Sequence, residues 1–341
     1  MNKPLVILIA TASVFSARAA CGHHGFAVHY DVNDQVRIEG QVYKVRIKNP
    51  HAEIQIQAVD KDGNKVIWTC ETQAGSILRR KGVTADRFVA GEAIVVEGSR
   101  ARRNPHGCEV GSIYFADGRT LTLRSTAGHA RIGVNNVDEK TARKRQSVLG
   151  MWLRDSFSGP PMTPGFPDLI TEAGRAANAN YVGSRDDPTR QCSPVNPIRA
   201  WIAPGTPTEI RERDGQIEIQ HEFMDTTRIV DMHGNDYPEK IARSIMGHSV
   251  GRFDGEALIV DTSLFEAGVM LTHVAFDGGV LHSDDLELTE VYSVVRDTGE
   301  LKIEWAARDA QYFPEPITGE LLLSPTNLAI DRFDCVPYAT D

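Results

Sequence analysis

The sequence predicts a mainly β protein with two barrels, a small one followed by a larger antiparallel one, behind a secretory signal. Apolar and polar residues alternate over many short stretches, which is the two-residue period of a half-buried strand. Turn pairs such as Asp-Gly and Thr-Gly separate these stretches at the short intervals of hairpin loops. We therefore expect a signal peptide over residues 1–20, a first β domain over 21–124, a linker over 125–147 and a barrel domain over 148–341.

The N-terminus has the three parts of a secretory signal. Lys3 supplies a positive charge, residues 5–15 form an apolar stretch, and Ala17-Arg18-Ala19 puts small residues where a signal peptidase reads them. An ordinary N-terminal helix or a membrane anchor is the alternative, but the apolar stretch is too short to span a bilayer and no later run is longer. Cys21 does not predict a lipoprotein, because the arginine stands where a lipid-attachment motif has an apolar residue. We expect a periplasmic or secreted protein without an integral membrane segment.

The charge balance bears on the partners. The chain has 37 Lys and Arg against 46 Asp and Glu, a formal net charge of −9. Nucleic acids and anionic membranes need a basic partner surface, so this balance argues against both. The one basic run, residues 143–145, lies in the predicted linker and is typical of a solvated surface.

Five cysteines are expected to form disulfides first of all, because an exported chain meets an oxidising compartment. Two of them fall in each domain, and pairs within a domain need no alignment of one domain on the other. This favours Cys70 with Cys108 and Cys192 with Cys335. The second pair would tie the start of the second domain to its last strand. Buried free thiols are the alternative, above all for Cys70.

The first domain shows strands around one short helix. Period-two stretches and turn signals predict strands at Gln35–Ile47, His51–Val59, Lys65–Cys70, Glu92–Gly98, Glu109–Phe115 and Thr120–Leu123, with a helix at Gly75–Lys81. Three strands, a helix and further strands follow the order of an OB-like barrel. That fold often binds oligonucleotides or sugars, but the acidic balance argues against nucleic acid. We favour an accessory or interaction role.

His23 and His24 are a candidate metal site, with copper as the metal. If the signal peptidase cut after Ala20, the free amine, two amides and His23 would form a square-planar nitrogen site of the kind that Cu(II) or Ni(II) prefers. Cleavage after Ala19 would spoil that geometry, and adjacent histidines on an extended chain point to opposite sides. Ordinary surface or capping histidines are the alternative.

Several motifs of the first domain resemble a family of small exported bacterial domains of unknown function. They are His23-His24-Gly25-Phe26, Val36-x-Ile38-x-Gly40, Asn49-Pro50-His51 and Asp117-Gly118-Arg119. Members of that family begin with His-His-Ser-Phe, whereas this chain has Gly25 in place of the serine. The resemblance implies location and fold, and no activity.

The second domain is a succession of hairpins. It opens with Leu149-Gly150-Met151-Trp152, followed by a Pro- and Gly-rich loop over 159–167 and a helical patch over 171–177. The turn signals then predict three hairpins, which pair Gln216–Phe223 with Thr227–Met232, Ser249–Phe253 with Ala257–Thr262, and Leu286–Val295 with Leu301–Ala307. Leu328–Phe333 is the predicted last strand. Successive hairpins with alternating faces favour an antiparallel barrel over a parallel α/β sheet.

Two resemblances concern this domain. Gly150-x-Trp152 resembles the first strand of lipocalin-like barrels, in which an arginine from near the last strand stacks on the tryptophan. The resemblance implies that role for Arg332. A core tryptophan without such a partner is the alternative. The stretch 228–290 resembles the C-terminal half of uncharacterised exported bacterial proteins, on Gly247–Arg252, Val260-Asp261-Thr262, His282-Ser283 and Glu290. This resemblance implies no reaction.

Five residues of the second domain are candidates for acid–base chemistry. His248 and His282 would transfer protons, Glu290 and Asp261 would orient them, and Arg228 would stabilise an anion or enolate. Glu290 lies two residues from Leu288, so it shares an apolar face that points into the barrel and needs a partner there, which His248, His282, Arg228 or Arg308 could provide. We expect the imidazoles and Glu290 to converge on one point at a pocket wall. A buried Arg–Glu pair with hydrogen-bonded histidines is the structural alternative.

Three functions follow from these observations. The first is a periplasmic lyase or isomerase acting on an apolar small molecule in the second barrel without a cofactor. The second is a non-catalytic carrier of an apolar ligand in the same pocket. The third is a copper-binding envelope protein that works through His23 and His24.

Overall fold

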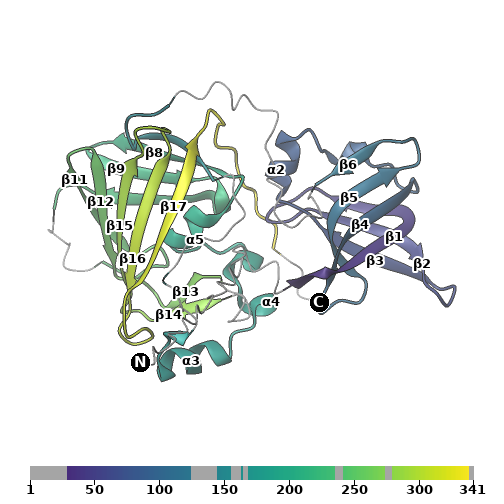
Figure 1. The fold of residues 1–341 in the computed structure, drawn as a ribbon, viewed down its shortest axis with the longest axis horizontal. Coiled ribbons are helices and arrows are strands. Elements are labelled where there is room, and N and C mark those ends of the chain that lie inside the picture. The colour runs from purple at the N-terminus through teal and green to yellow at the C-terminus, as the bar shows by residue number, and fades with distance from the viewer. Residues whose placement is uncertain are drawn as a thin grey trace, which may run out of the picture.

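The computed structural model describes residues 29–123, 144–154, 163, 168–234, 241–272 and 279–337. In these residues the chain is mainly β, with a separate sheet in the N-terminal part and a closed nine-stranded barrel in the C-terminal part, as predicted (Figure 1). The predicted signal peptide and most of the predicted linker lie outside the described residues. Among the described helices, none combines the length and the apolarity that crossing a membrane requires.

The N-terminal unit has the connectivity of the predicted OB-like barrel. Its elements are β1 (Tyr30–Arg46), β2 (Glu53–Val59), β3 (Lys65–Glu71), α2 (Gly75–Arg80), η1 (Ala85–Arg87), β4 (Ala93–Ala101), β5 (Gly107–Phe115) and β6 (Thr120–Thr122). The sheet order is β3-β2-β1-β4-β5-β6, and a parallel pairing of β3 with β5 closes the five-stranded part. Inward-facing apolar residues such as Ile54, Val96 and Ile113 fill the interior.

The larger barrel is closed by nine strands. They are β7 (Gly150–Leu153), β8 (Pro207–Arg213), β9 (Gln216–His221), β10 (Thr226–Asp231), β11 (His248–Asp254), β12 (Ala257–Ser263), β15 (Glu287–Val294), β16 (Leu301–Arg308) and β17 (Ile317–Pro325). Eight of the joints are antiparallel, but β10 and β11 run parallel, which differs from the succession of hairpins that we expected. Parallel neighbours cannot share a tight hairpin, and the connection 232–247 has the length of a crossover.

Several short helices and strands of this domain are not part of the ring of barrel strands. They are α3 (Glu172–Ala179), α4 (Gly183–Asp186), η4 (Pro188–Gln191), α5 (Pro197–Ile202), η5 (Phe223–Asp225), β13 (Gly268–Leu271) and β14 (Val280–His282). All residues of α5 are buried. Trp201 belongs to the apolar cluster of one part of the barrel and Ile198 to a second cluster, together with residues of β13 and β14. Helix α5 therefore lies where the two clusters meet.

Two expectations for the barrel were wrong. Leu328–Phe333 is not a strand, because β17 already pairs with β7 and closes the barrel before the chain reaches these residues. Arg332 does not stack on Trp152; its side chain is 84% exposed and pairs with Asp334. The guanidinium near Trp152 belongs to Arg145, whose Cζ lies 5.8 Å from the ring centroid.

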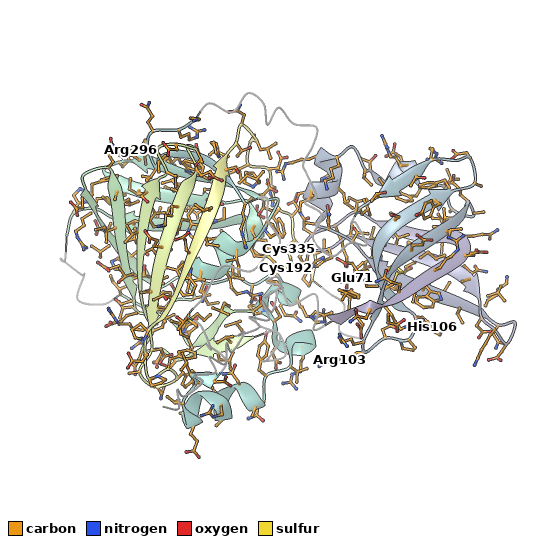
Figure 2. The ribbon with its side chains drawn as sticks, in the orientation of Figure 1. Glu71, Arg103, His106, Cys192, Arg296 and Cys335 are labelled. Atoms are coloured by element: carbon orange, nitrogen blue, oxygen red, sulfur yellow. A yellow bond between two sulfur atoms is a disulfide. The ribbon has the colours of Figure 1, made fainter. Side chains whose placement is uncertain are left out.

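Both predicted disulfides are present. Cys70 and Cys108 are register partners on the parallel pair β3 and β5, so their bond crosses the closing joint of the small barrel. The bond between Cys192 and Cys335 lies between the two units (Figure 2). Cys335 belongs to the tail beyond β17 and not to the last strand, contrary to our expectation.

The two units meet through α2. Arg80 donates to the carbonyl of Gly205 at 3.5 Å and forms an ion pair with Glu222, whose side chain is fully buried. Ile77 packs so closely on Gly205 that a Cβ there would lie 2.8 Å from the isoleucine Cδ1. A buried ion pair and a tight apolar contact hold the small barrel against the large one.

Candidate functional site

A buried polar cluster lies inside the large barrel. Arg228 comes from β10, and Glu290 and Tyr292 come from β15, where residues two apart point to the same face. Arg228 Nη2 lies 2.6 Å from Glu290 Oε2, with side-chain exposures of 2% and 1%, and the Tyr292 hydroxyl donates to Glu290 Oε1 at 2.7 Å. An unpaired charge at this depth would destabilise the fold, so each of the two charged side chains offsets the cost of burying the other.

Hydroxyl groups complete the surroundings of the guanidinium. Arg228 donates through Nε to Ser249 Oγ at 2.8 Å and through Nη2 to Thr262 Oγ1 at 2.5 Å, so it links β10 to β11, β12 and β15. Burial acts to lower the pKa of Arg228, but Glu290 and Tyr292 outweigh it and raise the pKa. Burial and the Glu290 carboxylate raise the pKa of Tyr292 well above its ordinary value. The arginine is therefore charged and the tyrosine neutral, and the Glu290 carboxylate is the ion-pair partner of the arginine.

His221 and Trp201 extend the cluster. The Trp201 indole donates to the Tyr292 hydroxyl at 3.1 Å. The His221 ring stands edge-on to the same indole, with ring centroids 4.7 Å apart. His221 Nδ1 lies 2.9 Å from Thr208 Oγ1, while Nε2 is buried and has no hydrogen-bond partner in the described part of the chain. Burial, with Arg228 nearby, lowers the pKa of His221 to about 3, so the ring is neutral at pH 7.

Two described atoms of this cluster lack a hydrogen bond, Glu290 Oε2 and His221 Nε2, but the first faces the Arg228 guanidinium in an ion pair and the second faces no charge partner among the described residues. A buried polar atom without a partner costs about 1–3 kcal/mol. Whichever tautomer His221 adopts, Nε2 offers one hydrogen bond, as donor or acceptor, to a neutral group in the barrel interior. A molecule that reached Nε2 would gain a hydrogen bond there.

The predicted catalytic residues do not converge. Arg228 and Glu290 meet, as expected. His248 and Asp261 alternate with the buried Ser249 and Thr262 on β11 and β12, so they lie on the outer face, where Asp261 pairs with Arg252 at 2.9 Å. The expectation failed because one residue along a strand reverses the face.

His282 lies apart from the cluster as well. It is the last residue of β14, in the two-stranded sheet that adjoins the second apolar cluster. Its Nδ1 lies 2.8 Å from the Ser283 carbonyl, its ring stands edge-on to Phe265, and burial lowers its pKa. It is the buried, hydrogen-bonded histidine of the structural alternative.

Three residues of the cluster escaped prediction. Tyr292 had a signal, because it lies two residues from Glu290 and therefore on the same face. His221 had a weaker one, as the inward successor of Ile217 and Ile219 on β9. Trp201 had none, because only the tertiary position of α5 brings it into the barrel.

The candidate copper site at His23 and His24 lies outside the described residues. Within the described ranges, no group of three His, Cys, Asp or Glu side chains has the arrangement of a metal site.

Comparison with known proteins concerns the N-terminal part. No curated protein matches the chain. Residues 11–109, which include β1 to β4 and the start of β5, match the model of a family of unknown function (DUF6152).

Proposed function

We propose that this chain is an exported binding protein whose large barrel carries a small, mainly apolar molecule without changing it. The observation that carries the proposal is the buried, unpartnered Nε2 of His221, set beside Trp201 among apolar residues of β9 and α5. A ligand that supplies one hydrogen-bonding group there would remove the cost of the unpartnered atom. Two disulfides and the N-terminal signal pattern support the export part.

The same geometry favours carriage over acid–base catalysis. Glu290 is already bound by Arg228 and Tyr292, and His248 and His282 lie away from it. His221 resists protonation, because burial holds its pKa far below neutrality. A lyase or isomerase reaction would need a group that both takes and returns a proton near the working pH.

The charge balance of the cluster specifies the polar end of the ligand. Arg228 has its counter-charge in Glu290, so the cluster of Arg228, Glu290, Tyr292, Trp201 and His221 offers no unpaired cation to a carboxylate. A neutral imidazole pairs best with a neutral hydroxyl or carbonyl group. We therefore expect an apolar alcohol, ketone or ester to bind in preference to the acid of the same chain length.

The test is a fluorescence titration with 1-dodecanol and dodecanoate. The alcohol should change tryptophan emission saturably, because Trp201 touches His221, and dodecanoate should bind more weakly. His221→Phe keeps an aromatic ring but removes the nitrogens, and should weaken binding of the alcohol about 3- to 10-fold. The matched control is His233→Phe, since His233 is 69% exposed.

Two results would contradict the carrier. An unchanged spectrum at saturating alcohol, with a native mass equal to the polypeptide alone, would leave Nε2 to a buried water. Chemical conversion of a bound probe, if His221→Phe abolished that conversion, would show that the protein is an enzyme and not a carrier.

A further inference from the structure

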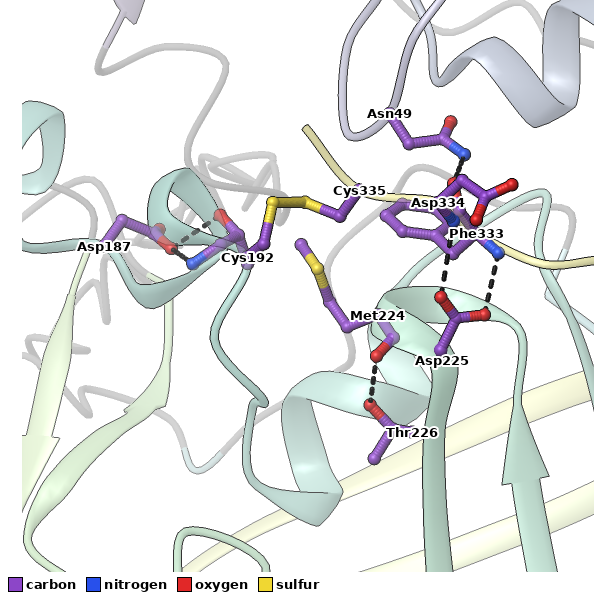
Figure 3. Close-up of a disulfide and its surroundings, with 10 residues drawn as sticks. Asn49, Asp187, Cys192, Met224, Asp225, Thr226, Phe333, Asp334 and Cys335 are labelled. Carbon is purple, nitrogen blue, oxygen red and sulfur yellow. Dashed lines mark hydrogen bonds between the residues drawn. A yellow bond between two sulfur atoms is a disulfide. The ribbon is translucent and has the colours of Figure 1, made fainter. Parts of the chain in front are cut away.

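The last described residues of the chain run between the two units, with a left-handed backbone at Asp334 (φ 46°). We call residues 331–336 the strap; it follows β17 and leads away from the barrel toward the small barrel (Figure 1). Figure 3 shows the strap between Asn49 of the small barrel and Asp225 of the large one. Neither of these contacts was expected from the sequence.

The large barrel holds backbone amides of the strap with carboxylates. Asp225 accepts from the amides of Phe333 and Asp334 at 2.8 and 3.3 Å, and Glu222 accepts from the amide of Asp331 at 3.1 Å. Both carboxylates belong to the η5 turn that follows β9. These bonds go to main-chain amides, so they do not depend on which side chains the strap carries.

The small barrel holds the strap chiefly through Asn49, in the connection between β1 and β2, while Arg80 Nη2 of α2 lies 3.8 Å from Asp331 Oδ2 at the start of the strap. The Asn49 side-chain amide donates to the Phe333 carbonyl, and its own carbonyl accepts from the Val336 amide at 2.8 Å. Asn49 and Cys335 are partners in a parallel β-bridge. Asn49 is only 1% exposed, and its Oδ1 accepts from the Ser76 amide at 3.0 Å, which fixes the orientation of the side chain.

Besides the disulfide of Cys335, one buried side chain anchors the strap. Phe333 is 1% exposed and stands edge-on to Phe223, with ring centroids 5.4 Å apart. Its neighbours Arg332 and Asp334 point to solvent and pair with each other. Main-chain bonds together with one buried aromatic side chain are one pattern by which proteins bind peptide segments.

We propose that Asn49, Asp225 and the ring of Phe223 form a docking site for a peptide segment, which this chain fills with its own strap. The site is distinct from the one around His221 and does not depend on the proposed carrier function. The ligand class is a peptide segment with one buried aromatic residue, followed by a residue with left-handed backbone as at Asp334, and recognised through its main chain. The family match includes Asn49 and ends long before the strap, so the matched part carries the loop and not its occupant.

The test supplies the strap as a separate peptide. The host protein is the chain ended after Ile330 with Cys192→Ser, and the probe is a fluorescent peptide of residues 331–341 with Cys335→Ser. Anisotropy should show saturable binding. Asn49→Ala in the host should weaken it about tenfold, and Phe333→Ala in the peptide should weaken it at least as much. Arg332→Ala in the peptide should have little effect.

A matched control and a second measurement keep the proposal falsifiable. Asn33→Ala removes an exposed amide of the same unit and should leave binding unchanged. If the shortened host does not fold, hydrogen exchange of the Val336 amide in the intact chain replaces it: Asn49→Ala should speed exchange about tenfold, and Asn33→Ala should not. A folded host that does not bind the peptide, or affinity and exchange insensitive to Asn49→Ala, would show that the strap is held only by its covalent tether.

Discussion

Replacing Glu290 by glutamine tests whether the Arg228–Glu290 pair is essential to the barrel. The substitution keeps the shape but removes the charge, and leaves the guanidinium with neutral partners only: the amide oxygen of the new side chain and the hydroxyls of Ser249, Thr262 and Tyr292. Both side chains are almost fully buried. Breaking a buried pair on one side costs ~3–5 kcal/mol. For a domain of this size, that loss lowers Tm by about 6–20 °C.

Thermal unfolding followed by tryptophan fluorescence measures the effect, since Trp201 is bonded to the cluster through Tyr292. The matched control is Glu304→Gln on the adjoining β16, where the carboxylate is 51% exposed and pairs with Lys302 on the surface. An exposed pair contributes little, so this variant should keep the wild-type Tm.

A double variant completes the argument. Arg228→Met together with Glu290→Gln removes both charges, so it should be more stable than Glu290→Gln alone. A Tm for Glu290→Gln within about 2 °C of wild type would refute the reasoning, because it would mean that Arg228 tolerates its charge unpaired. Strictly additive effects in the double variant would refute it too, because paired residues must show coupling.

Three further predictions concern pH, the disulfide of the tail and the contact between the units. Because burial lowers the pKa of folded His221 to about 3 from an ordinary 6.5, the unfolded chain takes up a proton that the folded chain refuses. This contribution to stability is complete above pH 6.5 and is lost as the pH falls from 6.5 toward 3. In urea unfolding at a series of pH values, the free energy of unfolding of His221→Phe should therefore fall less steeply over this range than that of the wild type. Replacing Cys192 and Cys335 by serine opens a loop with a sequence separation of 143 and should cost ~3–5 kcal/mol in the chain-entropy model, seen as a lower urea midpoint. Arg80→Met leaves the buried Glu222 without its cation and should expose the junction between the units to limited proteolysis, whereas unchanged cleavage would contradict that role.

The sequence was sufficient for most of the strands, because their period-two patterns and turns are local. Residues 216–221 and 226–231 form the expected hairpin, and so do 287–294 and 301–308. Strand β17 was missed because Gly319 interrupts its pattern. The glycine is required there, because a Cβ would lie 2.3 Å from the Trp305 ring. The reason for a glycine within this strand is therefore a tertiary contact, which the local sequence pattern does not show.

The site was harder to predict than the fold. Glu290 could be placed inside the barrel because its neighbours two residues away are apolar, and Arg228 was named as one possible partner. His248 and Asp261 were misplaced because the inner face of a strand depends on register, which a single strand does not fix. Trp201 and the strap depend on contacts between segments far apart in sequence, and no local pattern encodes them.

The parallel joint between β10 and β11 has a consequence for the strand count. Strands in a closed ring can alternate in direction all the way round only if their number is even, so a barrel of nine must contain a joint that breaks the alternation. Here that joint has two register pairs, Val230 with Ser249 and Asp231 with Val250. A tenth strand inserted at this joint would run antiparallel to both neighbours, whereas at any other joint it would run parallel to one of them. The β10–β11 joint is therefore the place where the ring can be enlarged, by a strand from a partner or by design, with every direction restored to alternation.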